Sequence, residues 1–357
     1  PPLCQAEDGI RDSVNGLVGS EMCIRDRTMP GGRVGIQVAA TTPPGSLVGV
    51  VRQVERLGYG ELWLAEDYFE LGGMSSVAAA LGATARIPVG LGVVSGRVRH
   101  PAVTAMELAT LSSLHPGRFM AGLGHGVPYW TGQMGLRPTS LIRSLRECTS
   151  AVRRLLDGQE LTEEGEYYSY HEVRLLHPPA EHVPLYFGVH GPRSLELAGE
   201  LADGTLLGWF SSPEYVRWAR ERIDEGRAAA GRTDDHAVVA LLVCSLDDDD
   251  PDAARAELRA WSSAFLAAQA DLPATRATDV GRALRAALEA RVDDDESLPD
   301  DLIGEFMAAG SVADCRRSVD RLLDAGADRV VLVPNPAGQR SLDGMVEQIR
   351  RGSALLG

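Results

Sequence analysis

From residue 33 onward, short apolar runs rich in β-branched residues alternate with longer amphipathic stretches. The short runs predict eight strands: RVGIQV (33–38), ELWLA (61–65), PVGLGVV (88–94), RFMAGLG (118–124), PLYFGV (184–189), GTLLGW (204–209), AVVALLVC (237–244) and RVVLVP (329–334). Helices are expected at 47–58, 102–114, 144–158, 193–202 and 312–326, several of them ending in glycine. This alternation predicts parallel βαβ units. Eight parallel strands close most economically into a (β/α)8 TIM barrel, and an open doubly wound sheet is the alternative.

Two segments interrupt the alternation. Residues 159–182 predict a hairpin insertion before strand 5, and residues 247–310 predict a helical insertion between strands 7 and 8 that packs over one end of the barrel. Residues 1–28 show no periodicity and look like translated sequencing-adapter sequence, so they are interpreted as a non-native, disordered tail. Residues 29–357 are expected to form a single domain.

Charge and composition exclude several classes of partner. The net charge of −15 is spread over many short acidic runs, which argues against nucleic acid or an anionic membrane as a partner. No apolar run approaches the roughly 20 residues of a membrane span, and no secretory pattern stands near the start, so a cytoplasmic location is expected. The five cysteines form no CxxC pair and predict reduced, buried thiols, with neither a disulfide framework nor a metal site.

A glycine-rich loop follows the fourth predicted strand, in the sequence GLGHGVPYW (122–130). Gly122, Gly124 and Gly126 are expected to let the backbone approach a ligand and expose its N–H groups, and a tight turn is the alternative. The GxGxG spacing, with no helix expected directly after it, does not match a dinucleotide fingerprint. In a barrel this loop lies at the C-terminal rim, where ligands bind.

The fifth predicted strand leads through GVHGPRS (188–194) directly into a helix. Pro192 falls near the first helical position and Ser194 in the first turn. Free N–H groups and the helix dipole beside Arg193 would suit a phosphate ester. The alternative is an ordinary turn with a solvent-exposed arginine.

Charged residues also follow the second and third strands. Glu66 and Asp67 stand at the end of strand 2, and since neighbouring strand residues point to opposite sides, they are not expected to act as a paired acid and base. Either one of them exchanges a proton with a bound ligand, or both are surface acids. Arg97 and Arg99 would face an anionic ligand or solvent, and His100 before Pro101 is interpreted as a helix-start residue rather than a catalyst.

The chain from about residue 33 to 356 resembles the luciferase-like monooxygenase superfamily, in particular the coenzyme F420-dependent branch that includes methylenetetrahydromethanopterin reductases. The resemblance rests on LWLAEDY, GLGVVSGRVRHP, GRFMAGLGHGVPYW, GEYYSY, VPLYFGVHGPRSLELAGELADGTLLGW and LLDAGADRVVLVP. It implies an oxidoreductase that moves a hydride between the deazaflavin C5 and an organic small molecule, and a homodimer. FMN is the alternative cofactor, in a reduced-flavin-dependent monooxygenase. A non-catalytic flavin- or deazaflavin-binding protein is a third possibility.

The resemblance also implies roles for individual residues. A non-prolyl cis peptide, here Gly92–Val93, would stand behind the coenzyme ring. The matching contact positions are Glu66 and Ser95 at the ring, His125, Gly126 and Trp130 in the glycine-rich loop, and His190, Gly191, Arg193 and Ser194 in the phosphate-binding turn. Two positions depart from the sugar-phosphate dehydrogenases of the branch, which have a catalytic histidine at Asp67 and a glutamate at Val127. A different substrate is therefore expected, with Asp67 or Glu66 at most assisting hydride transfer.

Overall fold

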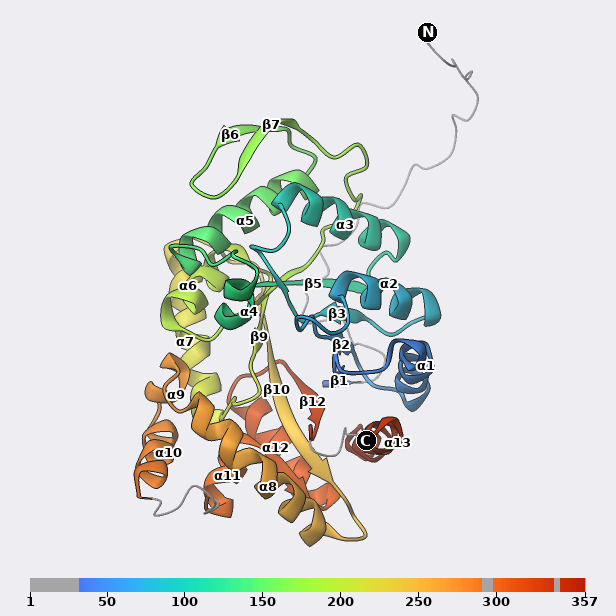
Figure 1. Cartoon of the computed structure of the whole chain (residues 1–357), viewed down its shortest axis with the longest axis vertical. Coiled ribbons are helices and arrows are strands. Elements are labelled where there is room, and N and C mark those ends of the chain that lie inside the picture. Colours follow the sequence, from blue (N-terminus) through green and yellow to red (C-terminus); the bar gives the residue numbers. More distant parts are fainter. Residues whose placement is uncertain (1–31, 291–297, 337–340, 357) are drawn as a thin grey trace.

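Eight parallel strands close into a barrel at the centre of the protein (Figure 1). The computed structural model describes residues 32–290, 298–336 and 341–356, so the predicted tail over 1–28 lies outside the described residues. Hydrogen bonding runs from β10 through β12, β1, β2, β3, β5, β8 and β9 and back to β10, with every pairing parallel. The strands are β1 (Val34–Val38), β2 (Leu62–Leu64), β3 (Val89–Leu91), β5 (Phe119–Gly124), β8 (Leu185–Gly188), β9 (Gly204–Leu207), β10 (Ala237–Leu246) and β12 (Arg329–Pro334). The predicted TIM barrel is confirmed.

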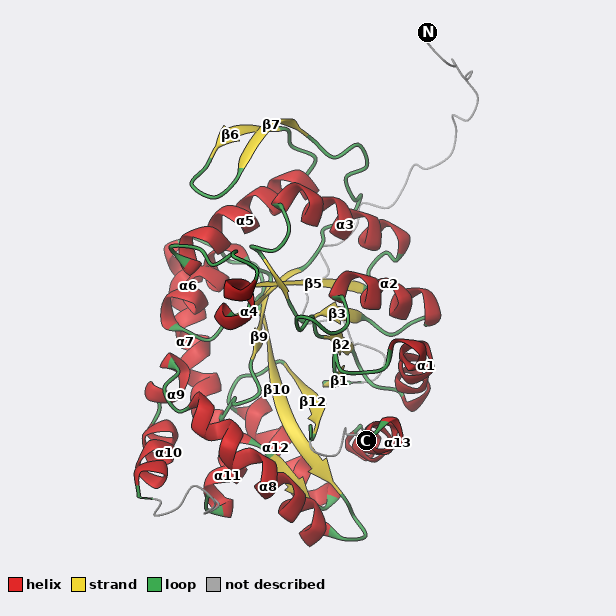
Figure 2. Ribbon diagram, viewed as in Figure 1, coloured by secondary structure: helices red, strands yellow, loops and turns green. Residues whose placement is uncertain are grey.

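Helices surround the strands, as Figure 2 shows. They are α1 (Leu47–Leu57), α2 (Gly73–Ala83), α3 (Pro101–Leu114), α5 (Leu141–Leu156), α6 (Pro192–Leu201), α7 (Pro213–Ala229), α12 (Val312–Asp324) and α13 (Leu342–Gly352). Serine side chains cap several of them, including Ser140, Ser212 and Ser311, each of which accepts a hydrogen bond from a backbone N–H in the first turn. The bounds of α1, α3, α5, α6 and α12 confirm the five helices expected from periodicity.

The N-terminal end of the barrel is closed by a buried polar cluster. The Glu61 carboxylate accepts from the Trp63 indole at 2.8 Å and lies 3.3 Å from the Arg329 guanidinium, which donates to the Tyr186 hydroxyl at 2.6 Å. Gly90 makes room for the indole, since a Cβ there would lie 2.4 Å from the Trp63 ring. Buried charges are tolerated when each has a partner, and this cluster fills the closed end of the barrel.

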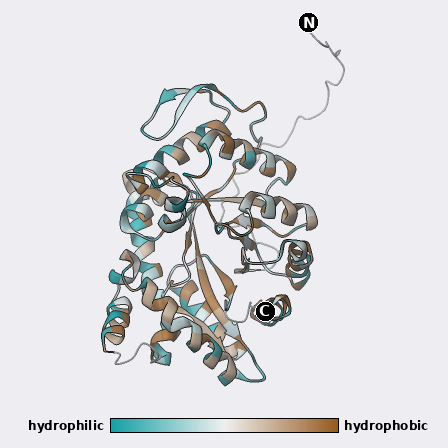
Figure 3. Ribbon diagram, viewed as in Figure 1, coloured by the Kyte–Doolittle hydropathy of each residue, from teal (hydrophilic) through white to brown (hydrophobic). Residues whose placement is uncertain are grey.

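Both predicted insertions are present. β6 (Leu161–Glu164) and β7 (Ser169–Val173) form an antiparallel hairpin before β8, and Figure 3 shows it as a largely hydrophilic projection outside α5. The helical insertion between β10 and β12 comprises α8 (Pro251–Gln269), α9 (Pro273–Arg276), α10 (Asp279–Glu289) and α11 (Asp300–Phe306). Phe265 of α8 contacts the ring of Trp209, just beyond β9, at 6.0 Å. The insertion therefore packs against the rim at the C-terminal ends of the strands.

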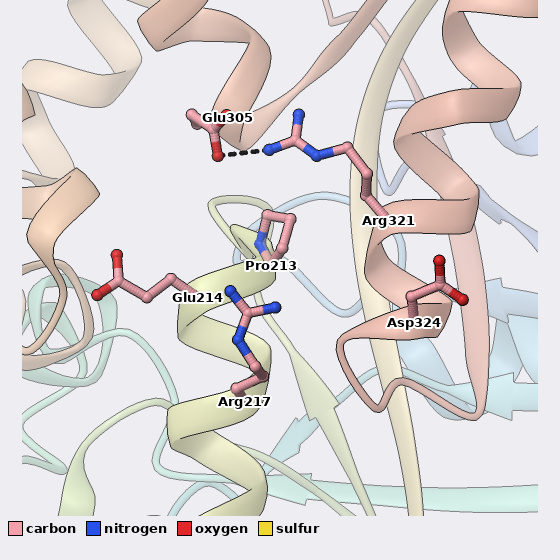
Figure 4. Close-up of a pocket in the computed structure, with 6 residues that line it drawn as sticks. All are labelled: Pro213, Glu214, Arg217, Glu305, Arg321 and Asp324. Atoms are coloured by element: carbon pink, nitrogen blue, oxygen red, sulfur yellow. Dashed lines mark hydrogen bonds and ion pairs between the residues drawn. The ribbon is translucent and has the colours of Figure 1, made fainter.

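A cleft marks the outer junction of the insertion with the barrel helices (Figure 4). Its lining carries both signs of charge and consists of Pro213, Glu214, Arg217, Glu305, Arg321 and Asp324. Glu305 pairs with Arg321 at 2.5 Å, and Glu214 accepts from the first N–H groups of α10, those of Asp279 and Val280. These charges fasten the insertion to α7 and α12.

Three short elements were not expected from the sequence. β11 (Ala308–Gly310) pairs with the end of β10, β4 (Val94–Ser95) pairs with the end of β5, and α4 (Pro128–Gln133) follows the glycine-rich loop. The expectation that no helix follows that loop directly is therefore wrong, because Pro128 starts a six-residue helix.

Cys148, Cys244 and Cys315 are buried free thiols, as predicted, while Cys4 and Cys23 lie outside the described residues. Within the described part of the chain, no helix has the length and apolar character needed to cross a membrane. The same part contains no group of three or more His, Cys, Asp or Glu side chains placed to hold a metal ion.

Candidate active site

Two residues, Gly92 and Val93, follow β3 at the mouth of the barrel, and they are called the step from here on. The Gly92–Val93 peptide bond is cis, as the resemblance implies, and a second non-prolyl cis bond joins Tyr68 and Phe69. Beyond the step, Val94 and Ser95 of β4 pair with Leu123 and Gly124. The backbone thus continues along β5 after the step.

The glycines of β5 serve this step rather than a ligand. A Cβ at Gly122 would lie 1.9 Å from the Leu91 carbonyl oxygen, and a Cβ at Gly124 would lie 2.7 Å from a Val93 methyl group. Their backbones pair with β8 in the sheet. The expectation that Gly122 and Gly124 bring the backbone close to a ligand is therefore wrong, because the space above them is filled by β3. Gly126 has a φ of +72° and makes room for the Ser95 side chain.

Gly122→Ala is therefore expected to destabilise the protein by about 3 kcal/mol, at the upper end of overpacking costs, because the clash is with backbone. Urea unfolding followed by circular dichroism measures the change. Gly49→Ala is the control, since an added Cβ in α1 meets no atom within 4 Å and should gain about 0.5–1 kcal/mol from helix propensity. Equal urea midpoints for Gly122→Ala and the unaltered chain would contradict this account of the glycine.

Glu66, at the end of β2, is buried and fully engaged. Arg99 donates from Nη1 and Nη2 to its two carboxylate oxygens at 2.7 and 2.8 Å, and the Gly73 N–H donates at 2.8 Å. The Tyr68 hydroxyl adds a fourth bond at 3.2 Å. Arg99 thus faces neither an anionic ligand nor open solvent, and the reading of Glu66 as a surface acid is wrong. The Glu66 carboxylate joins the exits of β2 and β3, that is, the segments that follow the C-terminal ends of these strands.

Asp67 has a different environment from its neighbour. Burial, together with the negative charges of Glu70 and Glu66, raises the pKa of Asp67 from 3.8 to about 6. A carboxyl group with such a pKa is available in both protonation states near neutral pH. Of the two adjacent acids, Asp67 is the one suited to proton exchange.

The exits of β4, β5 and β8 are joined by hydrogen bonds. Ser95 Oγ donates to the His125 carbonyl oxygen at 3.2 Å, and His125 Nε2 lies 2.8 Å from Ser194 Oγ. Burial lowers the pKa of His125 to about 4, and burial with the nearby His125 lowers the pKa of His190 to about 4. Both imidazoles are therefore neutral near pH 7. Trp130, on α4, contacts the Tyr68 ring edge-on at 6.0 Å and so joins the β2 and β5 exits.

The exit of β8 forms an open helix terminus. Gly191 is the N-cap of α6, Pro192 occupies the first turn, and no side chain caps the helix. Arg193 is exposed, and Ser194 is buried against His125. His190 Nδ1 is buried with no hydrogen-bond partner among the described residues. This donor set fits an anionic group such as a phosphate ester.

The structure therefore gathers the predicted site residues of four strand exits, and their roles toward a cofactor stay predictions. Arg97 lines a small pocket with Gly124 and His125 at the β5 exit. Its guanidinium donates to the Leu136 carbonyl at 3.5 Å and stacks on Tyr167 and Tyr168 at 5.3 Å. His100 caps α3 by accepting from the Ala102 N–H, as its position before Pro101 indicates. The ring contact between Tyr68 and Trp130 was not predicted, because no local sequence pattern indicates that these two residues meet.

A closed parallel barrel with polar groups collected at the C-terminal ends of its strands belongs to the class of (β/α)8 proteins that bind ligands at that rim. Within that class, the chain belongs to the luciferase-like monooxygenase family, which it matches over residues 28–329.

The proteins similar to this chain include enzymes with different substrates. The chain is 26% identical over 309 residues to a 5,10-methylenetetrahydromethanopterin reductase from Methanolobus tindarius, covering 83% of this chain and 92% of the relative. It is 30% identical over 239 residues to an F420-dependent glucose-6-phosphate dehydrogenase from Microbacterium testaceum, covering 63% and 71%. The fold matches that of an F420-dependent secondary alcohol dehydrogenase in complex with an F420-acetone adduct, with a TM-score of 0.73, 20% identity and coverage of 90% and 98%.

Proposed function

We propose that this protein is a coenzyme F420-dependent oxidoreductase that transfers a hydride between the deazaflavin C5 and an organic substrate. The observation that carries the proposal is the set of bonds that joins the exits of β2, β4, β5 and β8 at one rim, above all the bond between His125 and Ser194. The F420-dependent relative supports the choice of cofactor.

The described residues fit such a cofactor in two parts. Gly191, Arg193 and Ser194 at the open terminus of α6 would hold its phosphate, with the unpaired His190 Nδ1 nearby. The ring would lie beside Val93 at the step, in contact with Glu66, Ser95, His125, Gly126 and Trp130. When bound, the coenzyme supplies the hydride chemistry, and the protein supplies orientation.

Asp67 is the residue proposed to move the proton. In the direction of substrate reduction, its carboxyl group would donate a proton to the substrate, and in the reverse direction its carboxylate would accept one. Glu66 is proposed as a positioning residue, since its carboxylate is occupied by Arg99, Gly73 and Tyr68. With Asp67 and Val127 at the two departing positions, a substrate other than glucose 6-phosphate is proposed.

A reduced-flavin monooxygenase is the second candidate, and the name of the matched family favours it. It would use FMN, consume oxygen and insert one oxygen atom into its substrate. A non-catalytic carrier would bind a coenzyme without turnover. Oxygen uptake in the presence of reduced FMN tests the former, and oxidation of reduced coenzyme by a panel of acceptors tests the latter.

The cofactor is tested by titrating the protein with coenzyme F420 and with FMN while following tryptophan fluorescence, to which Trp130 at the rim contributes. F420 is expected to bind more tightly, and Arg193→Ala to weaken it about tenfold through loss of a charge-assisted contact. Arg143→Ala is the control, because Arg143 is exposed on α5 and pairs with Glu166. Binding of FMN alone would contradict the choice of cofactor.

The same proposal includes a homodimer formed through α2 and α3, which follow neighbouring strands. Their exposed positions carry no charge: Ser75, Ala78 and Gly82 on α2, and Val103, Met106, Thr110, Ser113 and Leu114 on α3. Met106 and Leu114 are 53% and 67% exposed. The exposed apolar side chains of Val103, Met106 and Leu114 on one helix support an interface here. In a chain of net charge −15, an uncharged face can meet a copy of itself across a two-fold axis without like-charge repulsion.

Met106→Glu is expected to convert this dimer to monomer, because it places a carboxylate from each copy in an otherwise uncharged interface. Sedimentation equilibrium measures the mass. Leu176→Glu is the control, since Leu176 is 82% exposed in the connection between β7 and β8. A monomeric unaltered protein, or an unchanged mass for Met106→Glu, would overturn the dimer.

A further inference from the structure

Around Asp67 the barrel rim is aromatic. We use the name aromatic rim for Tyr68, Phe69, Tyr129 and Trp130, from the exits of β2 and β5. The Tyr68 ring contacts those of Phe69 and Trp130 at 6.2 and 6.0 Å. Phe69 and Tyr129 are 69% and 70% exposed, and the adjacent Val127 is 45% exposed. Large apolar side chains that gather in the open beside a functional group indicate a binding surface.

Carboxylates outnumber guanidinium groups in the segments that surround the aromatic rim. The three exit segments 66–73, 92–100 and 125–136 contain three carboxylates and two guanidinium groups. Arg99 is taken by Glu66 and Glu107, and Arg97 stacks on the hairpin tyrosines and donates to a carbonyl. Arg97 pairs with no carboxylate among the described residues, so the charges left are those of Asp67, Glu70 and Arg97. The two carboxylates belong to the β2 exit, which also carries Tyr68 and Phe69.

The histidines of these segments do not change the balance. His125 is neutral near pH 7, and His100 uses Nδ1 to accept the Ala102 N–H at the start of α3. The exposed guanidinium of Arg193 belongs to the β8 exit, which the proposed function assigns to the cofactor phosphate. A substrate anion stacked on Phe69 would therefore lie beside the carboxylates of the β2 exit, Asp67 and Glu70.

We propose that the aromatic rim binds the reacting substrate, and that this substrate is a flat, conjugated molecule that is neutral or cationic at the end that enters the site. The flat faces of Phe69 and Tyr129 would contact it, and Asp67 with Glu70 would disfavour phosphorylated or carboxylated molecules. This inference rests on the proposed function for its link to the reaction.

Three naphthalenes that share the ring and the substituted position but carry substituents of different charge test the inference: naphthalene-2-carboxamide, 2-naphthoate and protonated 2-(aminomethyl)naphthalene. Their dissociation constants are measured by calorimetry near pH 7, with and without coenzyme F420. The neutral and cationic molecules are expected to bind at least about tenfold more tightly than 2-naphthoate, as unpaired like charge costs about 1.4 kcal/mol or more. Equal or tighter binding of 2-naphthoate would overturn the inference.

Phe69→Ala and Tyr129→Ala are each expected to raise the dissociation constant of the carboxamide about fivefold, the value of one aromatic contact. Both side chains are largely exposed, so folding should be unaffected. Leu176→Ala is the control, because Leu176 is 82% exposed in the connection between β7 and β8 and lies outside the proposed dimer surface. If the two aromatic variants bind the carboxamide as the control does, the aromatic rim is not the substrate surface.

The two proposals fail separately. Absence of F420 binding, with the expected order of the three naphthalenes, would overturn the proposed function and leave the charge and shape preference of the rim in place. Normal F420 binding with tight binding of 2-naphthoate would overturn the substrate class alone. The F420 affinities of Phe69→Ala and Tyr129→Ala should match that of the unaltered protein, since neither residue is assigned to the cofactor.

Discussion

Asp67→Asn is expected to lower the rate of substrate reduction about 10²-fold, because the amide cannot supply the proton that the carboxyl group of Asp67 would donate. Oxidation of reduced F420 by menadione, a flat neutral acceptor, measures the rate above the background without protein. Affinity for F420 is expected to stay unchanged, which separates a proton-transfer defect from a loss of binding. Val127→Ala, a truncation at the neighbouring exit, controls for a change in shape. An unchanged rate for Asp67→Asn would remove Asp67 from the mechanism.

The pH dependence gives a second measurement of the same residue. Since the pKa of Asp67 is raised to about 6, the reduction rate is expected to fall as pH rises through that value, and Asp67→Asn should abolish this titration. The folded state binds the proton more tightly than the unfolded chain, so the stability linked to protonated Asp67 is present below its ordinary pKa of 3.8 and is lost as pH rises through about 6. Asp67→Asn should therefore be more stable than the unaltered protein at about pH 8 and no more stable below about pH 4. Parallel stability profiles of the two proteins would contradict the raised pKa.

Glu66→Ala is expected to destabilise the protein by about 3 kcal/mol. Removing this carboxylate leaves the guanidinium of Arg99 and the Gly73 N–H without their acceptor, and breaking a buried pair by deleting one partner costs about 3–5 kcal/mol. The lower limit is appropriate, because the Arg99 side chain is 23% exposed. Urea unfolding measures the loss.

The controls for Glu66 use a second ion pair of the same type. Arg143 and Glu166 are 63% and 45% exposed, so Glu166→Ala should cost at most about 1 kcal/mol. The double variant Glu66→Ala/Arg99→Ala should recover part of the loss, because it removes the orphaned charge as well. A loss for Glu66→Ala no larger than that of Glu166→Ala would show that the buried pair contributes little.

The main strands and helices were predictable because local patterns set them. Each barrel strand is a short apolar run bounded by turn residues, and the helices between them repeat with helical periodicity. The short elements β11 and α4 were not predictable, since three or six residues carry too little periodicity. β11 forms because the end of β10 extends to Leu246 and offers it a partner.

The positions of the site residues followed from the topology, because parallel strands in a closed barrel all end at one rim. Their partners did not follow. Glu66 and Arg99 are 33 positions apart and meet only when the exits of β2 and β3 are in place. The roles of Gly122 and Gly124 likewise depend on the register between β3 and β5, which fixes where Leu91 and Val93 lie.

The buried cluster of Glu61, Trp63, Tyr186 and Arg329 has a consequence for how such proteins diversify. It secures the floor of the barrel with groups that make no contact with Asp67 or the aromatic rim in the described hydrogen bonds and ring contacts. Loops at the mouth can then be exchanged between family members without repacking the floor. New chemistry can accordingly be grafted onto an inherited scaffold.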